Sequence, residues 1–115
     1  MNLTVTKSFS FDSAHQLPWH PGKCRNLHGH TYRLDVSIAG PLNESGIVVD
    51  FDDISSVVKR SIIERFDHQL LNDHFPNPTA EIVALEFSKL LEAEGLEVQR
   101  LTLWETPTSS ATVER

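Results

Sequence analysis

The stretch Cys24-Arg25-Asn26-Leu27-His28-Gly29-His30 joins a polar, Pro-containing loop to a run in which apolar and polar residues alternate. Alternation with a period of two predicts a β-strand that begins near His28. Successive side chains of a strand point to opposite faces, so His28 and His30 share one face while Gly29 presents only hydrogen to the other. Two imidazoles side by side on one rigid strand suit a divalent metal ion.

A second alternating run precedes the loop. Apolar residues from Leu3 to Phe11 alternate with Thr, Ser and Asp, with Lys7 as the one exception, and predict a half-buried strand. The end of this strand carries His15, which is therefore the candidate for a third ligand. Residues 12–27 predict a long loop, a feature that is usually functional in a small domain. The strand after it runs to about Ile38 and stops at Gly40-Pro41.

Two helices are predicted next. The first begins near residues 50–53, where acidic side chains suit the positive end of the helix dipole, and keeps helical apolar spacing to Phe66. The second has Asn77 as its N-cap, Pro78 at its first position and Gly95 as its stop. Alternation then predicts a strand from Val98 to Trp104 and a short last strand over residues 111–115.

The predicted order of elements is ββααββ in a single domain of residues 1–115. Strands joined locally favour an α+β fold, with a four-stranded antiparallel sheet and both helices on one face. The other face and the edges of such a sheet would be exposed. Sheets from several chains that close into an oligomeric β-barrel would cover them, so we expect a homo-oligomer.

Composition argues against several classes of protein. Among the 115 residues, 39% are hydrophobic and 23% charged, and no apolar run is long enough to span a membrane, so we expect no membrane partner. The net charge of -6 and the lack of a basic cluster argue against nucleic acid as a partner. The single cysteine precludes an internal disulfide and the N-terminus lacks signal-peptide features, so we expect a cytoplasmic protein.

Three neutral histidines around one divalent ion would leave a coordination position open, which is the pattern of a catalytic zinc site. Two alternatives stay open on the residues alone. The histidines could simply form hydrogen bonds within the fold, or Cys24 could be a fourth ligand and close a structural site. As a catalyst, Cys24 would need a lowered pKa, which the flanking Lys23 and Arg25 would favour.

Two further groups could take part in chemistry. Asp67 beside His68 could fix the tautomer of the imidazole for proton transfer, although histidines also occur at helix ends because the dipole favours them. Glu105 alternates in phase with Leu101 and Leu103, so its carboxylate ends a strand on an apolar face. It could accept two parallel N–H bonds from a pterin or guanine ring, or it could be a solvated acid at the end of the strand.

Several motifs follow one another in the order of a known family: Phe-Asp-Ser-Ala-His15, Cys24-x-x-x-His28-Gly-His30, Asp67-His68-Gln-Leu-Leu-Asn72, Asn77-Pro-Thr-Ala-Glu81 and Trp104-Glu105-Thr106. Together they resemble the 6-pyruvoyl-tetrahydropterin synthase family, and within it the bacterial 6-carboxy-5,6,7,8-tetrahydropterin synthases of queuosine biosynthesis. The resemblance covers essentially the whole chain. Its most specific part is the spacing of three residues between Cys24 and His28, and Ile82 departs from the Asn that is common in the family.

The resemblance implies a tunnelling fold (T-fold), a homohexamer of two trimeric barrels, and active sites shared between subunits. It implies three zinc ligands: His15, His28 and His30. It implies three residues that take or relay protons: Cys24 as general base, and Asp67 with His68. It implies a pterin pocket anchored by Glu105 and lined by three further residues: Thr79, Glu81 and Thr106.

The reaction implied by the resemblance is that of a zinc-dependent lyase. It converts 7,8-dihydroneopterin triphosphate into 6-carboxy-5,6,7,8-tetrahydropterin, acetaldehyde and triphosphate. Lys23, Arg25 and Arg33 are candidates for binding the triphosphate. Two alternatives stay open: a 6-pyruvoyl-tetrahydropterin synthase, which would retain the side-chain carbons, and a zinc-stabilised pterin-binding module without turnover.

Overall fold

The computed structural model describes all of residues 1–115. The strands are β1 (Thr4–His15), β2 (His28–Ala39), β3 (Gln69–Leu70), β4 (Arg100–Thr106) and β5 (Ser109–Glu114). The helices are α1 (Phe51–Val58), α2 (Glu64–Phe66) and α3 (Ala80–Ala93), and a π-helical segment, Lys59–Ile63, makes α1 and α2 one continuous rod. Short 3₁₀ turns occupy Lys23–Arg25 and Leu71–Asp73. None of the helices is both long and apolar enough to cross a membrane.

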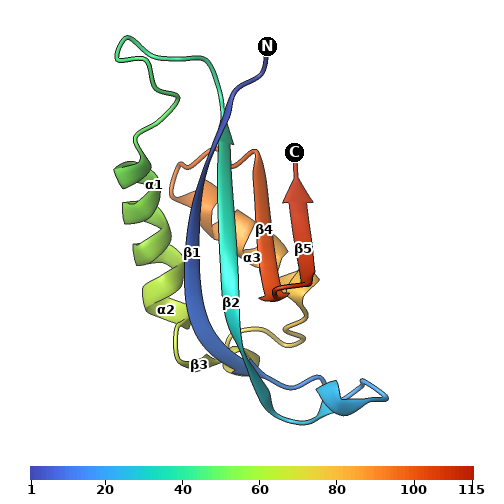
Figure 1. The fold of residues 1–115 in the computed structure, drawn as a ribbon. Coiled ribbons are helices and arrows are strands. Elements are labelled where there is room, and N and C mark those ends of the chain that lie inside the picture. Colours follow the sequence, from blue (N-terminus) through green and yellow to red (C-terminus); the bar gives the residue numbers. More distant parts are fainter.

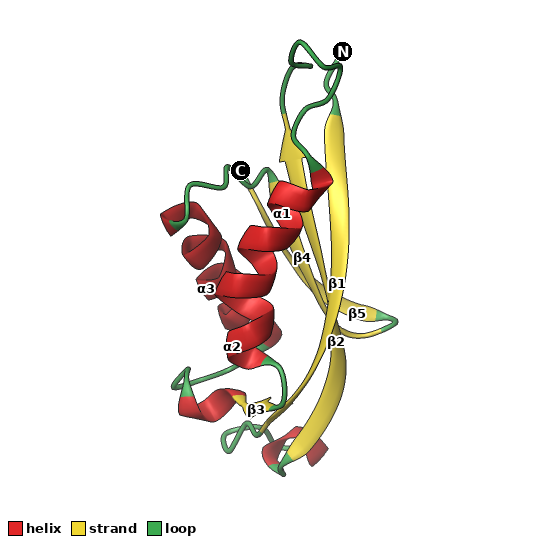
Figure 2. Ribbon diagram, turned by 90° about the vertical axis from the view of Figure 1, so that its left-hand side faces the viewer, coloured by secondary structure: helices red, strands yellow, loops and turns green.

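The strands form one sheet in the order β3-β1-β2-β4-β5. The four longer strands pair antiparallel, and both helical rods lie on the same face of the sheet (Figures 1 and 2). The predicted α+β architecture is therefore confirmed. The sheet nevertheless has one strand more than the four predicted, because β3 pairs in parallel with β1 through residues 69 and 70. A strand of two residues has no periodicity by which a sequence could reveal it.

The longest part of the sheet is the β1–β2 hairpin, whose pairing runs from Thr4 opposite Ala39 to His15 opposite His28. Strand β1 is longer than predicted, and the loop starts at residue 16 rather than 12. Ser13 and His15 face inward and are buried, as the alternation requires, but they are polar and so conceal the pattern. Burial of Ser13 is tolerated because its hydroxyl donates a hydrogen bond to the carbonyl of Phe66.

The second helix starts later than the sequence predicts. Thr79, rather than Asn77, is the N-cap of α3, and its hydroxyl accepts a hydrogen bond from the Ile82 amide at 3.2 Å. The side chain of Asn77 instead accepts a hydrogen bond from the Trp19 indole. At the other end, Gly95 has a φ of 86° and stops the helix as predicted, because glycine adopts this conformation without a steric penalty.

The hydrophobic core lies between the sheet and the helices, where Leu34, Ile54, Phe87 and Leu101 are fully buried. The helix-free face is polar, with a hydroxyl pair formed by Thr102 and Thr112. The sheet also has open edges: nothing pairs with the outer side of β5, and β3 covers β1 at only two positions. In a single chain, one face of the sheet and its edges therefore stay exposed. This is the exposure that the oligomeric β-barrel expected from the sequence would cover.

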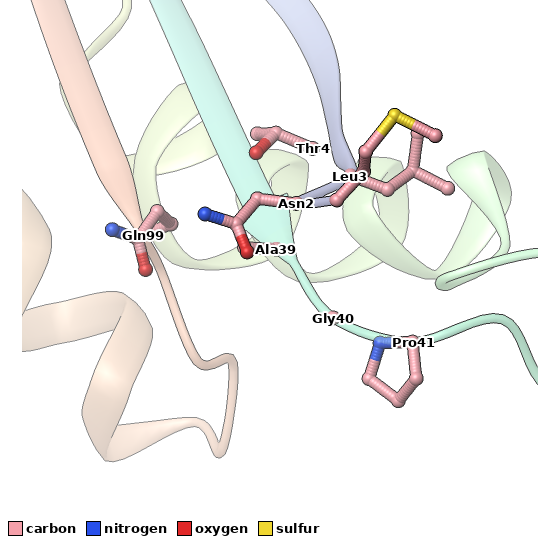
Figure 3. A pocket seen from close by; sticks show the side chains of 8 residues that line it. Asn2, Leu3, Thr4, Ala39, Gly40, Pro41 and Gln99 are labelled. Atoms are coloured by element: carbon pink, nitrogen blue, oxygen red, sulfur yellow. The ribbon is translucent and has the colours of Figure 1, made fainter.

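A hollow lies at the end of the hairpin opposite to the histidines, beside the N-terminus (Figure 3). Its volume is about 560 Å³, and its walls come from the first residues of the chain, the end of β2 and the start of β4: Met1, Asn2, Leu3, Thr4, Ala39, Gly40, Pro41 and Gln99. None of these side chains is a metal ligand or an acid–base group, so this hollow is not the candidate active site.

Candidate metal centre and active site

Three histidines converge where the hairpin ends. His15 is the last residue of β1, His28 is the first of β2, and the antiparallel register places them directly opposite each other. His30 follows on the same face of β2. One ring nitrogen from each lies within 4.8 Å of those of the other two, and His15 Nε2 is 3.2 Å from His30 Nε2. The structure therefore brings together all three residues that the sequence proposes as metal ligands.

Backbone carbonyls form hydrogen bonds with the Nδ1 atoms of two of these rings. His15 Nδ1 lies 2.8 Å from the Pro78 carbonyl oxygen, and His28 Nδ1 lies 2.7 Å from the Asn26 carbonyl oxygen. A carbonyl only accepts, so each Nδ1 carries the hydrogen and each Nε2 keeps a lone pair directed at the cluster. Fixing the tautomer through the second ring nitrogen is a common feature of metal-binding histidines.

The donor set fits zinc. Nitrogen ligands at about 2.0–2.1 Å from a tetrahedral zinc ion lie roughly 3.3–3.4 Å apart, close to the 3.2 Å between His15 and His30. That distance also suits an N–H···N hydrogen bond, so the case for a metal rests on all three nitrogens converging. Burial lowers the pKa of His30, and neighbouring His15 and His28 lower it further against an opposing effect of Glu105. A lowered pKa favours the neutral imidazole that binds metal.

Glu105 lies beside this cluster. Its Oε1 is 3.7 Å from His15 Nε2, and 25% of its side chain is exposed. Leu101 and Leu103 of the same strand are fully buried, so Glu105 has the phase that the sequence predicts. Burial, and to a lesser extent the charge of Glu105, raise the pKa of Tyr32 well above its usual range. A partly exposed carboxylate here can accept N–H bonds from a ligand that reaches the cluster.

Cys24 occupies the 3₁₀ turn between the exposed Lys23 and Arg25, and is itself half-buried. The amide of Leu17 donates to the Cys24 carbonyl at 2.9 Å, which closes the loop on itself. The Cys24 sulfur is not among the ligand atoms that lie within 4.8 Å of one another in the histidine cluster. This geometry favours the open three-histidine site over a closed site with a thiolate as fourth ligand.

Asp67 and His68 form a separate group at the turn between α2 and β3. Asp67 Oδ1 lies 3.0 Å from His68 Nδ1 and accepts the Asp12 amide hydrogen at 2.9 Å. The hydrogen bond from the Asp12 amide, followed by that from His68, lowers the pKa of Asp67. His68 has a φ of 57° and an exposed side chain. The Asp12 carboxylate also lies within 4.8 Å of the ligand atoms of Asp67 and His68, and the sequence analysis assigned Asp12 no role.

The other three residues proposed to line the pterin pocket form no hydrogen bond or ion pair with the histidine cluster in the single chain. Thr79 caps α3, and the Thr106 hydroxyl accepts a hydrogen bond from the Thr108 amide at 3.3 Å. Glu81 is exposed in the first turn of α3. Among the four proposed pterin contacts, Glu105 is the one paired with a histidine of the cluster.

The sequence of the chain is similar to those of known proteins. The sequence profile of the family described as 6-pyruvoyl tetrahydropterin synthase matches residues 4–115. The chain belongs to this family. A 6-carboxy-5,6,7,8-tetrahydropterin synthase of Haemophilus influenzae is 39% identical over 91% of this chain and 94% of its own length. One of Synechocystis is 40% identical over 93% of this chain and 89% of its own length.

The fold of the family is also present. The structure of Caenorhabditis elegans 6-pyruvoyl tetrahydropterin synthase superimposes with a TM-score of 0.87 at 23% identity, covering 100% of this chain and 96% of that one. A Plasmodium falciparum 6-pyruvoyl tetrahydropterin synthase superimposes with a TM-score of 0.78 at 18% identity, covering 99% and 98%. The expected T-fold is thus confirmed for the single chain, and with it the recognition of the 6-pyruvoyl tetrahydropterin synthase family.

Proposed function

We propose that this family member is a zinc-dependent 6-carboxy-5,6,7,8-tetrahydropterin synthase of queuosine biosynthesis. Its substrate would be 7,8-dihydroneopterin triphosphate, and its products 6-carboxy-5,6,7,8-tetrahydropterin, acetaldehyde and triphosphate. The observation that carries the proposal is the convergence of three histidine nitrogens with Glu105 beside them. The names of the Haemophilus influenzae and Synechocystis relatives support this branch of the family.

His15, His28 and His30 would hold the zinc ion through Nε2. When bound, zinc supplies Lewis acidity toward the hydroxyl groups of the substrate side chain. The carbonyls behind His15 and His28 keep both rings in the tautomer that this role requires. Glu105 would accept two N–H hydrogen bonds from the pterin ring, and this would orient the side chain of the substrate toward the histidine cluster.

Proton transfer falls to the residues around the cluster. Cys24, in the turn between Lys23 and Arg25, would take a carbon-bound proton as the general base. His68, oriented by Asp67 at 3.0 Å, would move protons on the other side of the substrate. Triphosphate then leaves by elimination. Cleavage between the first two side-chain carbons releases acetaldehyde, and a water molecule supplies the second oxygen of the carboxylate that remains on the ring.

Thr79, Glu81 and Thr106 would line the pterin pocket, with the two threonine hydroxyls still able to donate while they accept their local hydrogen bonds. Lys23 and Arg25, both exposed in the Cys24 turn, would meet the triphosphate. Arg33 is the weaker candidate for that contact, since its Nε is bound to Asp35 at 2.9 Å.

The assembly we propose is a homohexamer of two trimeric barrels, with active sites completed between subunits. Two observations support it: the open edges of β1 and β5, and the fact that Asp67 and His68 cluster with Asp12 rather than with the three histidines. Edge pairing between copies would close the sheet, and a neighbour could supply the second proton-transfer group. The cytoplasm, which keeps thiols reduced, suits the catalytic role proposed for Cys24.

The test is incubation of the zinc-loaded protein with 7,8-dihydroneopterin triphosphate, with acetaldehyde and triphosphate measured separately. We expect both products in equal amounts, and neither from protein stripped of zinc. Triphosphate without acetaldehyde would instead indicate a 6-pyruvoyl-tetrahydropterin synthase. Tight binding of the pterin with no release of either product would indicate a binding module and overturn the enzymatic proposal.

A further inference from the structure

The side chain of Asn72 binds both backbone polar groups of a single residue, Gln16. Asn72 Oδ1 accepts the Gln16 amide hydrogen at 2.9 Å, and Asn72 Nδ2 donates to the Gln16 carbonyl oxygen at 2.8 Å. A carboxamide offers one acceptor and one donor in a plane, so the two bonds fix the orientation of the backbone as well as its position. Asn72 lies in the 3₁₀ turn Leu71–Asp73, and its side chain is part-buried.

The residue that Asn72 holds lies between the two halves of the proposed site. Gln16 directly follows His15, the last residue of β1, and it begins the loop that carries Cys24. The next residue, Leu17, donates its amide hydrogen to the Cys24 carbonyl. A displacement of Gln16 would therefore be transmitted to a proposed zinc ligand on one side and to the proposed general base on the other.

Two further contacts join the same pair of segments. The Pro78 carbonyl accepts from the His15 ring at 2.8 Å, and Asn77 Oδ1 accepts from the Trp19 indole at 2.8 Å. Residues 72–78 thus contact the chain at positions 15, 16 and 19, where β1 ends and the loop leaves the sheet. Beyond His15 the pairing of β1 with β2 no longer holds the chain, so these contacts replace it.

We propose that Asn72 is a positioning residue that fixes His15 and the Cys24 loop in one relative arrangement. This inference rests on the proposed function, because the proposed function assigns His15 its role as a zinc ligand and Cys24 its role as general base. Asn72 itself binds backbone rather than substrate, so its effect should fall on turnover rather than on capture of the pterin, which Glu105 on β4 would anchor.

The experiment uses the fact that Cys24 is the only cysteine, so that its rate of alkylation by iodoacetamide reports on the loop without background. Asn72→Ala removes both hydrogen bonds, whereas Asn72→Asp keeps an acceptor for the Gln16 amide and loses the donor. The matched control is Asn43→Ala, because Asn43 also binds backbone amides, those of Ser45 and Ile47, in a remote turn. All variants are measured as zinc-loaded full chains well below their unfolding temperatures.

Two neutral hydrogen bonds correspond to roughly a 5- to 150-fold change in a local opening equilibrium. For Asn72→Ala we expect alkylation of Cys24 to accelerate about tenfold and kcat to fall about tenfold or more, with KM for the pterin within about twofold. Asn72→Asp places a carboxylate oxygen against the Gln16 carbonyl oxygen, and because two acceptors repel each other it should alkylate at least as fast as Asn72→Ala, whereas Asn43→Ala should match the wild type.

The proposal is overturned if Asn72→Ala alkylates at the wild-type rate, if Asn43→Ala accelerates alkylation equally, or if KM rises while kcat is kept. Failure of the proposed function is distinguishable from these results. A wild-type protein that does not turn over 7,8-dihydroneopterin triphosphate would refute the assigned reaction, while the alkylation rates would still decide whether Asn72 holds the Cys24 loop.

Discussion

Glu105 Oε1 lies 3.7 Å from His15 Nε2, which places the end of β4 beside the end of β1 although β2 runs between them. His15 lies opposite His28 of β2 whereas Trp104 lies opposite Arg33, so β1 runs past the end of β4, and the two side chains, which both project on the helix-bearing face, span this offset. A proposed pterin anchor and a proposed metal ligand are thereby close enough for one small substrate to engage both.

Removal of a histidine from the cluster should abolish zinc binding. For His28→Ala we expect the loss in zinc affinity to exceed the roughly 10- to 100-fold that removal of an outer hydrogen-bond partner causes. Competition with a chromogenic chelator measures it. Cys24→Ala is the control and should keep the affinity of the wild type while losing turnover. An equal loss of zinc in both variants would mean that Cys24 is a ligand in a closed site.

The metal-free protein should lose stability as the pH falls below 6.5. The pKa of His30 is lowered from 6.5 in the folded chain, chiefly by burial, so the unfolded chain binds more protons in the window just below that value. Stability therefore rises with pH through this window and levels off above 6.5. Denaturant titrations at a series of pH values measure the slope. His30→Gln should flatten the slope, and an unchanged slope would contradict the assignment to His30.

The backbone conformation of His68 should lower the stability of the protein, while its side chain should be required for activity. Its φ of 57° is in the left-handed region, where a side chain costs about 1–2 kcal/mol relative to glycine. We expect His68→Gly to unfold with a free energy about 1 kcal/mol higher than that of His68→Ala. Both should lose kcat by roughly 10²- to 10⁴-fold. Thermal unfolding and product assays measure the two effects, and equal stability of the variants would argue against strain at this position.

Asp35 should stabilise the sheet below the proposed site. On the helix-free face its carboxylate accepts from Ser8 at 2.6 Å, Arg33 at 2.9 Å and Trp104 at 3.1 Å, which connects β1, β2 and β4. We expect Asp35→Ala to lower the free energy of unfolding by about 1–3 kcal/mol. Thr102→Val, which breaks a hydroxyl pair on the same face, should cost less.

The same network predicts the behaviour of Asp35 in acid. Burial alone would raise the pKa of Asp35, but hydrogen bonds from Ser8, Arg33 and Trp104 outweigh it and bring the pKa below the ordinary 3.8. The stabilisation is therefore complete above 3.8 and is lost as the pH falls through the lower folded value. Chemical-shift titration of the Asp35 carboxyl carbon measures this pKa directly. A value above 3.8 would contradict the network.

Most of the fold could be predicted from local pattern. The period-two alternation defined four strands, helical spacing defined two helical rods, and Gly95 marked the end of α3. The errors came where a residue's local preference was overridden. Asn77 is a favourable N-cap by type, yet its side chain binds the Trp19 indole, and the cap moved to Thr79.

The sequence by itself determined that His28 and His30 share a face, because the geometry of a strand fixes the direction of every second side chain. Only the tertiary structure decided that His15 meets them, since this depends on the register of a hairpin that pairs residues 4 and 39 at its other end. The contacts of Pro78 with His15, of Asn72 with Gln16 and of Asp12 with Asp67 were decided in the same way. They use backbone atoms, which every residue carries, so no residue type could reveal them before the chain was folded.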